Sequence, residues 1–374
     1  MSKSVAAVVL VIALSPICFA RRVEVLYLEA YNYASQQALL YTYNVNPQTA
    51  ATLQVGPVVQ VPTTSIDPLT IGSMHVLYLW NGTDLWKYNT NTQGVPQSQG
   101  SQHLTFGFPY PVISFVADPD GKSAYAGIGW RNNVYGNYAA VVLFTIDPST
   151  GDLTNTRQVV ASYGPNYYIP VTKFLFGGSG RRLYFFEDYS PAPHSCGGEY
   201  NFYDVDQKTG ALGPGQPLVG WGYCGAYNTG TFSDSLTAVA NAPFGRGSGT
   251  LVLDGTFIGQ TITCTPSMLM FCGDEPWTLS FDPASENIFF GDVDTGLMSA
   301  GHIHFQDLQL LPTTFSIPMS DLFFSPDNKL IYGVTLNEIN IYAFDPNTGD
   351  ISASSLLPRT TGDVNVATAT LRVK

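Results

Sequence analysis

The fold is decided by the stretch Phe323-Phe-Ser-Pro-Asp-Asn328 and its continuation, Ile339-Asn-Ile-Tyr-Ala-Phe-Asp-Pro-Asn-Thr-Gly-Asp-Ile351. The same order occurs earlier, in Phe115-Val-Ala-Asp-Pro-Asp-Gly121 and then Val141-Val-Leu-Phe-Thr-Ile-Asp-Pro-Ser-Thr-Gly-Asp-Leu153. In both places a short apolar strand ends at a turn in which Pro fixes φ and Gly or Asn accepts a positive φ. A later strand ends at an Asp-Pro-x-Thr-Gly turn. The chain therefore contains an internal repeat of short strands and tight turns.

Partial copies of this repeat occur elsewhere in the chain. They are Phe202-Tyr-Asp-Val-Asp-Gln-Lys-Thr-Gly-Ala-Leu212, Leu279-Ser-Phe-Asp-Pro-Ala284 and, in degenerate form, Tyr41-Thr-Tyr-Asn-Val-Asn-Pro-Gln-Thr49. Four antiparallel strands per unit, repeated roughly every 40 to 60 residues, are typical of a β-propeller blade. The sequence thus predicts an all-β propeller, in preference to a pair of β-sandwiches or a β-helix.

Seven segments have the pattern of the first, innermost strand of a blade. We expect them to begin near Ser65, Val112, Val171, Leu236, Trp277, Asp321 and Val364. The last of these lies at the C-terminus, whereas residues 23–28 have the pattern of a second strand. This offset predicts seven blades in which the C-terminal strand joins the N-terminal blade and closes the ring, which removes free sheet edges.

The composition agrees with an all-β fold and excludes one class of partner. The chain has 374 residues, with 36 Gly and 25 Pro along its whole length, and only 12% of its residues are charged. Abundant turn residues suit many short strands, and no long stretch after residue 22 has a helical apolar period. The net charge of −12 would repel a phosphate backbone, so we do not expect nucleic-acid binding.

Residues 1–20 have the pattern of a secretory signal peptide. Lys3 precedes an apolar run over 5–14, and Cys18-Phe-Ala20 places small residues at the −3 and −1 positions of a cleavage site. The apolar run is too short to span a bilayer comfortably. We therefore expect a secreted or periplasmic, monomeric protein, with residues 21–374 forming a single domain that has no transmembrane segment after cleavage.

Four cysteines remain after this cleavage. They are Cys196, Cys224, Cys264 and Cys272. An even number of cysteines in an exported chain indicates two disulfides. Of the three possible connectivities, the one that joins nearest neighbours is favoured. The cysteines lack the close spacing of a zinc site, so we expect no metal and no cofactor.

The turn motifs resemble those of seven-bladed propellers of the lactonase and YVTN-repeat type, which are similar to WD40 propellers in architecture. The resembling runs are Phe-Ser-Pro-Asp-Asn-Lys-Leu-Ile-Tyr at 324–332 and Phe-Asp-Pro-Asn-Thr-Gly at 344–349. The lactonase branch implies opening of a sugar lactone by a cluster of His, Arg and acidic residues on one propeller face. The histidine that this branch places shortly before a proline and an inner strand is absent from 108–111 and 167–170, so no catalytic residue is transferred.

The candidate site residues belong to the loop face, the face on which chain segments lead into first strands and on which second and third strands are joined. As catalytic candidates the sequence offers Arg131, His194, Glu199 and Glu275. The binding candidates are Tyr135, Tyr138, Tyr167, Tyr168, Asp274 and Trp277. Carboxylates and imidazoles can move protons, and exposed aromatic rings can stack on sugars or peptides.

Each candidate also has a plain structural interpretation. Residues 189–200 are expected to form a long loop, which is either a ligand-presenting segment or a surface insertion pinned by Cys196 and Cys224. Asp274 and Glu275 suit either acid–base chemistry or a solvated turn. A third loop should carry Arg131 to Tyr138. His75 and His103 have no visible partners in the sequence.

Two functional hypotheses follow. The first is an exported binding or scaffold module, not an enzyme, which recognises a carbohydrate, peptide or protein through its loop face. It rests on aromatic-rich loops without a recognisable catalytic constellation. The alternative is a divergent hydrolase of the 6-phosphogluconolactonase type that opens a sugar lactone.

Overall fold

The computed structural model describes the backbone of most of the chain after residue 23. The described residues are 24–32, 37–46, 49–61, 65–71, 74–108, 111–132, 136–163, 167–169, 174–177, 182–192, 195–221, 227–232, 236–242, 250–255, 260–263, 276–281, 287–292, 298–304, 307–315, 321–325, 329–334, 339–348, 350–356 and 364–373. These residues form strands and turns and contain no helix. The expected all-β architecture is confirmed.

The described strands form seven antiparallel sheets. The first sheet contains β1 (Glu24–Asn32), β2 (Gln37–Val45), β3 (Thr52–Gln54), β4 (Val59–Val61) and β30 (Val364–Val373). The second contains β5 (Ser65–Ile71), β6 (Met74–Trp80), β7 (Asp84–Thr90) and β8 (Pro96–Thr105). The third contains β9 (Val112–Ala117), β10 (Ser123–Asn132), β11 (Gly136–Ile146) and β12 (Leu153–Tyr163).

The other four sheets follow in chain order. The fourth contains β13 (Tyr167–Ile169), β14 (Phe174–Gly177), β15 (Arg182–Ala192), β16 (Ser195–Asp204) and β17 (Gln216–Trp221). The fifth contains β18 (Tyr227–Phe232), β19 (Leu236–Ala242), β20 (Thr250–Gly255) and β21 (Gln260–Thr263). The sixth contains β22 (Pro276–Phe281), β23 (Asn287–Asp292), β24 (Met298–His304) and β25 (Asp307–Phe315). The seventh contains β26 (Asp321–Phe324), β27 (Leu330–Val334), β28 (Ile339–Asp345) and β29 (Asp350–Leu356).

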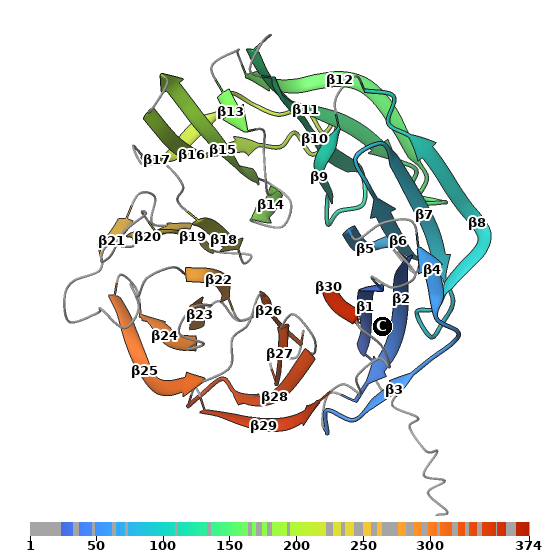
Figure 1. Cartoon of the computed structure of the whole chain (residues 1–374), viewed down its shortest axis with the longest axis vertical. Helices are drawn as coiled ribbons and strands as arrows, with labels where there is room; N and C mark the ends of the chain where they lie inside the picture. The colour runs from blue at the N-terminus through green and yellow to red at the C-terminus, as the bar shows by residue number, and fades with distance from the viewer. Residues whose placement is uncertain are drawn as a thin grey trace, which may run out of the picture.

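The sheets are arranged around a common centre, with their first strands inside and their last strands at the periphery (Figure 1). The C-terminal strand β30, red in Figure 1, lies beside the N-terminal strand β1, blue. These two strands pair antiparallel from Glu24 opposite Val373 to Asn32 opposite Val364, with one register shift after Glu29.

Two expected first strands differ from the structure. In the fifth sheet the innermost strand is β18, and Leu236 begins the second strand, β19. Phe232-Ser-Asp234 resembles the Phe-Ser-Pro-Asp turn after a first strand but lacks its proline, so the sequence repeat is obscured there. In the fourth sheet the first strand consists of two pieces, β13 and β14, which both pair with β15; Val171 itself lies outside the described residues.

The Asp-x-x-Thr-Gly turns have the geometry that their residues predict. Asp147 Oδ1 accepts hydrogen bonds from the Ser149 backbone N–H (2.7 Å) and hydroxyl (2.6 Å), which makes an Asx turn. The Gly151 N–H donates a hydrogen bond to the Asp147 carbonyl (2.7 Å), which closes the turn, and Gly151 has a φ of 73°. Asp206 and Gly210 repeat this arrangement in the fourth sheet. The carbonyl of the closing glycine is left pointing toward the preceding sheet.

The side chains of β1 alternate between the two faces of the first sheet, which packs against a neighbouring sheet on each side. Leu26 and Leu28 belong to an apolar cluster with the seventh sheet, which includes Tyr332. Val25 and Tyr27 belong to a cluster with the second sheet. Because successive side chains of a strand point to opposite faces, the first sheet buries one face against the seventh sheet and the other against the second.

Tyrosines in second strands join consecutive sheets through these turns. Hydroxyl-to-carbonyl bonds run from Tyr27 to Gly94, from Tyr78 to Gly151 and from Tyr125 to Gly210, each 2.7 Å long. Each bond is buried and reaches the turn between the outer two strands of the next sheet. A Cβ on the glycine would lie within 3.0 Å of a neighbouring side chain in all three turns, so the contact requires glycine. We call these three contacts the tyrosine latches.

A fourth contact of this kind lies between the seventh and first sheets. Tyr332 of β27 donates its hydroxyl proton to Glu24 Oε2 over 3.1 Å, and both residues are buried. Here a carboxylate oxygen takes the place of the glycine carbonyl. The sheet that contains the C-terminal strand is therefore joined to its predecessor through an ionisable group.

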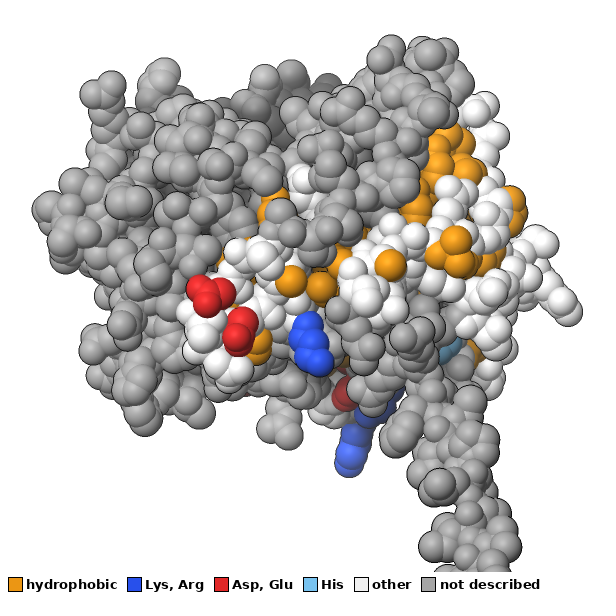
Figure 2. All heavy atoms as spheres, turned by 90° about the horizontal axis from the view of Figure 1, so that it is seen from below, with side chains coloured by type: hydrophobic (Ala, Val, Ile, Leu, Met, Phe, Trp, Pro, Cys, Tyr) orange, Lys and Arg blue, Asp and Glu red, His pale blue; other side chains and the backbone are white. Residues whose placement is uncertain are grey.

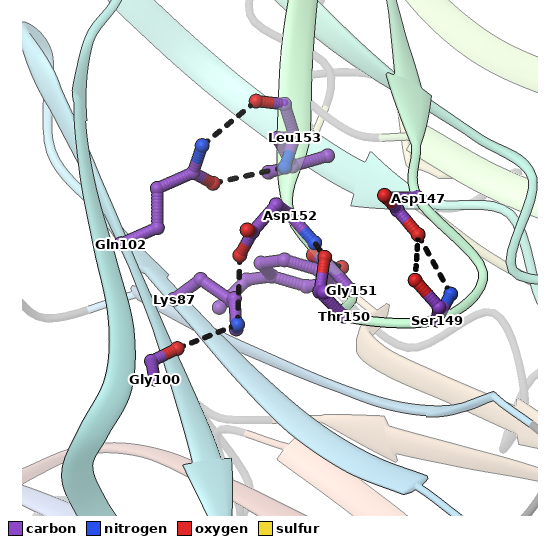
Figure 3. Close-up of polar contacts among 10 residues, drawn as sticks. Lys87, Gly100, Gln102, Asp147, Ser149, Thr150, Gly151, Asp152 and Leu153 are labelled. Atoms are coloured by element: carbon purple, nitrogen blue, oxygen red, sulfur yellow. Dashed lines mark hydrogen bonds and ion pairs between the residues drawn. The ribbon is translucent and has the colours of Figure 1, made fainter.

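A buried lysine connects the outer parts of the second and third sheets (Figure 3). Lys87 of β7 donates to the Gly100 carbonyl (2.7 Å) and to Asp152 Oδ1 (2.8 Å). Beside it, the side-chain amide of Gln102 exchanges two hydrogen bonds of 2.9 Å with the backbone of Leu153. The Lys87 side chain is 1% exposed and that of Asp152 is 45% exposed. The third sheet therefore supplies the carboxylate that pairs with this buried lysine.

Candidate functional site

The loop face of the third sheet carries two of the predicted residues on strands. Arg131 lies in β10 opposite Asn137, and Tyr138 lies in β11 opposite Trp130. The prediction of a loop from Arg131 to Tyr138 is thus wrong at both ends, because both residues lie in the paired strands of a β-hairpin. Tyr135 lies outside the described residues. Strand pairing fixes the backbone of Arg131 more firmly than a loop would.

The fourth sheet also extends into a segment that was expected to be a loop. β15 continues to Ala192 and β16 begins at Ser195, so most of the predicted loop 189–200 is a β-hairpin. The register places Glu199 of β16 opposite Glu187 of β15. Cys196 lies in β16 as well, and Cys224 lies outside the described residues. The alternating pattern of this segment was hidden by its Pro and Gly residues.

The predicted residues of the third and fourth sheets lie at the same end of neighbouring strands. Tyr167 and Tyr168 lie in β13, where Tyr167 pairs with Tyr189. β13 contacts both β10 and β11. The strand that carries Arg131 and the strand that carries these tyrosines are therefore adjacent at the loop face.

The remaining predicted site residues are placed only in part. Trp277 lies in β22, one residue after its start. His194, Cys264, Cys272, Asp274 and Glu275 lie outside the described residues. The two expected disulfides and the expected Asp274–Glu275 pair are thus not tested.

The structure brings together a polar cluster that the sequence did not reveal. Antiparallel pairing of β7 and β8 places Asp84 opposite Thr105 and Trp86 opposite His103. Asp84 Oδ1 accepts from His103 Nε2 (3.1 Å) and from the Thr105 hydroxyl (2.8 Å), and Asp84 Oδ2 accepts from the Thr83 hydroxyl (2.8 Å). β7 begins and β8 ends at the loop face, so this cluster lies on its outer rim.

Hydrogen bonding stabilises the charged form of Asp84. Its bonds to the hydroxyls of Thr83 and Thr105 lower the pKa of the Asp84 carboxyl, and His103 adds to this effect through its hydrogen bond and its charge. An ionised carboxylate only accepts hydrogen bonds, so Nε2 of His103 must carry the proton of their contact. In a neutral imidazole the other nitrogen, Nδ1, then has a free lone pair.

The imidazole of His103 is held on a second side by an indole ring. The rings of Trp86 and His103 stack with centroids 5.2 Å apart and planes 11° apart. Trp86 is itself partly buried against the apolar cluster between the first and second sheets. The His103 side chain nevertheless remains 56% exposed, whereas that of Asp84 is 25% exposed. His103 thus has two partners in the structure that were not visible in the sequence.

A second ionisable group lies between the first and second sheets. The side chain of Glu29 in β1 is fully buried, with 0% of its surface exposed. Within the described part of the chain neither of its oxygens has a hydrogen-bond partner. Burial raises the pKa of the Glu29 carboxyl to about 8. This carboxyl is therefore neutral at pH 7, because an unpaired charge there would be costly.

Two negative findings apply to the described residues alone. No three or more His, Cys, Asp and Glu side chains gather in a way that would hold a metal ion. No helix is long and apolar enough to cross a membrane. On the face shown in Figure 2, the coloured charged side chains are few and both signs are present.

Comparison with solved structures identifies the class of fold. A structure from Bacteroides fragilis, provisionally named a 6-phosphogluconolactonase, has a TM-score of 0.66 and 12% identity over 96% of this chain and 99% of its own. The periplasmic gluconolactonase of Pseudomonas aeruginosa has a TM-score of 0.56 and 14% identity over 94% of this chain and 99% of its own. The Dos1 propeller has a TM-score of 0.53 and 12% identity over 88% of this chain and 84% of its own.

These likenesses show that the chain has a β-propeller fold, similar to that of lactonase-type propellers. No protein-family model and no curated protein sequence matches it. At such identities the likeness defines the fold alone, because one fold supports many chemistries.

Proposed function

We propose that this protein is a lactone hydrolase built on a seven-bladed, closed β-propeller. The observation that carries the proposal is the likeness, over nearly the whole chain, to structures named as lactonases. The seven described sheets and the pairing of β30 with β1 support seven blades and a ring closed by the C-terminal strand. The binding-module hypothesis has no comparable support.

Opening a lactone requires three chemical contributions. A base activates water, a cation or a set of N–H donors stabilises the oxyanion, and an acid protonates the departing ring oxygen. We propose Arg131 for the oxyanion, and Glu199 or Glu275 for the acid. His194 is the base that the sequence offers. Tyr135, Tyr138, Tyr167, Tyr168, Asp274 and Trp277 would line the approach to these groups.

The adjacency of the third and fourth sheets favours part of this set. Arg131 lies in β10, which ends at the loop face, and Glu199 lies in β16, which begins there. β13 touches the strand of Arg131. The register also places Glu199 of β16 opposite Glu187 of β15.

The proposal is tested with the chain from Arg21 onward and three lactones. Glucono-1,5-lactone, its 6-phosphate and γ-butyrolactone are followed in a pH-stat, with spontaneous hydrolysis subtracted. We expect saturable turnover of at least one sugar lactone, and a loss of kcat in Arg131→Gln and Glu199→Gln. Rates equal to the buffer blank for all three lactones would overturn the proposal, and saturable sugar binding without turnover would support the binding module.

We further propose export and two disulfides. The leader of residues 1–20 and the four cysteines of the remaining chain support both. Intact-mass measurement of the exported protein should give the mass from Arg21 onward, less four hydrogens. Reduction should restore those four hydrogens, and an unchanged mass after reduction would contradict the disulfides.

A further inference from the structure

The cluster around Asp84 and His103 has the chemistry of a general base. We propose that His103, held by Asp84, is the catalytic residue that activates water for lactone hydrolysis. This inference rests on the proposed function and names a residue that the sequence did not assign. It places the base on strands of the second sheet instead of on the segment that contains His194.

The hydrogen bonds leave one imidazole nitrogen available. Nε2 of His103 is directed at Asp84 Oδ1 over 3.1 Å. The stack on Trp86 restrains rotation of the ring, so Nδ1 keeps one direction relative to the sheet. A carboxylate–imidazole pair of this kind orients the ring and stabilises the imidazolium that forms when a proton is taken up.

Asp84 is itself firmly positioned. The Asn81 side-chain oxygen accepts from the backbone N–H groups of Thr83 (2.8 Å) and Asp84 (2.7 Å), which makes a tight turn before β7. The Gly82 carbonyl of this turn accepts from the Val112 N–H (2.8 Å) at the start of β9. The second and third sheets therefore hold this turn together. Preorganisation of this kind limits the reorganisation that the reaction must bring about.

The reaction step balances with water as the only co-reactant. Nδ1 of His103 takes a proton from water as the water oxygen bonds to the lactone carbonyl carbon, and the carbonyl π electrons move to its oxygen. The resulting oxyanion collapses, and the bond between that carbon and the ring oxygen breaks. The acid of the proposed function, Glu199 or Glu275, gives its proton to the departing ring oxygen, and the proton of the imidazolium then returns through solvent to that carboxylate. The products are a hydroxyl and a carboxylic acid, which ionises in solution.

A purely structural role for this pair explains less. Asp84 already accepts hydrogen bonds from two threonine hydroxyls without His103. An ion pair with a side chain as exposed as that of His103 contributes little to stability. The imidazole of His103 therefore contributes little to stability. A catalytic role and a structural role thus predict different effects when the imidazole is removed.

The test compares histidines within the same chain. His103→Gln, Asp84→Asn and His194→Gln are assayed with glucono-1,5-lactone, and His75→Gln serves as the matched control. His75 lies in β6 of the same sheet, at the end opposite to the loop face. Urea unfolding of each variant shows whether it has kept the fold. His103→Ala is also assayed with added imidazole, which can reach a position as exposed as this one.

We expect His103→Gln to lower kcat by about 10²- to 10⁴-fold with little change in KM, the usual contribution of a general base. Asp84→Asn should lower kcat less and should shift the acid limb of the pH–rate profile. His75→Gln should match the parent, and imidazole should restore part of the turnover of His103→Ala.

Three results overturn the inference, and they are distinguishable. Parent-like turnover in a folded His103→Gln variant, with loss in His194→Gln, would assign the base to His194 and leave the proposed function standing. Absence of turnover in the parent would remove both the proposed function and this role. Loss of kcat without imidazole rescue, together with an equal loss of stability, would assign His103 a structural role only.

Discussion

The hydroxyl of Tyr78 shows how one atom can connect two sheets. It donates to the Gly151 carbonyl across the interface between the second and third sheets, in an apolar cluster from which water is excluded. A buried carbonyl without a donor is costly, more so than the hydrogen bond is favourable. The tyrosine latches therefore determine which neighbouring turn each second strand meets.

Tyr78→Phe should test this contribution. It removes the donor but keeps the ring, so we expect the free energy of unfolding to fall by about 1–3 kcal/mol. Urea denaturation should show a lower midpoint with an unchanged slope. Tyr88→Phe is the control, since Tyr88 is partly buried in the same sheet and makes no hydrogen bond through its hydroxyl within the described residues. Equal effects of the two substitutions would contradict the role of the latch.

Glu29 makes stability depend on pH. Burial raises the pKa of this carboxyl from 4.5 to about 8, so the folded state keeps a proton that the unfolded state releases above about pH 4.5. Stability is therefore greatest below the unfolded pKa and falls as the pH rises toward the folded value. The dependence ends above about pH 8, where both states have lost the proton.

Glu29→Gln removes this proton uptake. We expect the stability of the variant to depend less on pH than that of the parent between about pH 5 and about pH 8. At the alkaline end of this range the variant should be more stable than the parent. Thermal unfolding at several pH values provides the measurement. A parent and a variant with parallel pH profiles would show that Glu29 does not hold the proton.

At the scale of the element, β7 combines groups that serve different neighbours. Trp86 packs toward the first sheet, and Lys87 reaches the third sheet through Asp152. The alternation of side chains along one strand produces this division. The same strand supplies Asp84 to the rim of the loop face. A strand in the second sheet thus links two sheet interfaces to the candidate site.

The two partners of the Lys87–Asp152 pair should respond unequally to substitution. Asp152→Asn leaves a buried ammonium without its counter-charge, so we expect a loss of about 1–3 kcal/mol, less than for a fully buried pair because Asp152 is half exposed. Lys87→Met leaves a carboxylate that water can reach, so the loss should be smaller. Denaturant midpoints of the two variants measure the difference, and a larger loss in Lys87→Met would contradict it.

At the scale of the whole molecule, β30 contributes the innermost strand of the first sheet. It pairs with β1 from end to end, and β1 carries the buried residues of two sheet interfaces. Without β30, the ladder edge of β1 would be unpaired and free to bind other chains.

Deletion of residues 364–374 should therefore affect the folding of the whole protein and not only that of the first sheet. We expect the truncated protein to aggregate or to unfold with reduced cooperativity, whereas deletion of Lys374 alone should have no effect. Size-exclusion chromatography and urea unfolding distinguish these outcomes. A monomeric truncated protein with the parent's midpoint would show that the pairing of β30 with β1 contributes little.

Local sequence was sufficient for much of the fold. Ser65, Val112, Asp321 and Val364 coincide with the starts of β5, β9, β26 and β30, because each follows a stretch of sequence that contains Pro, Gly or Asp. Prediction failed at Leu236, where the marking turn has no proline, and at residues 189–200, where Pro and Gly lie inside strands. The functional candidates were less predictable, because adjacency in a propeller depends on strand register.

The sequence by itself determined the all-β class, the repeat, the glycine turns and the offset between the chain ends, since these follow from dihedral preferences and from spacing along the chain. Only the tertiary structure decided that Tyr78 meets Gly151, that Lys87 meets Asp152 and that His103 meets Asp84. The last of these pairs depends on a register shift between Lys87 and Asn89 in the pairing of β7 with β8. A one-residue slip there would move His103 to the other face of the sheet, and no local pattern specifies that shift.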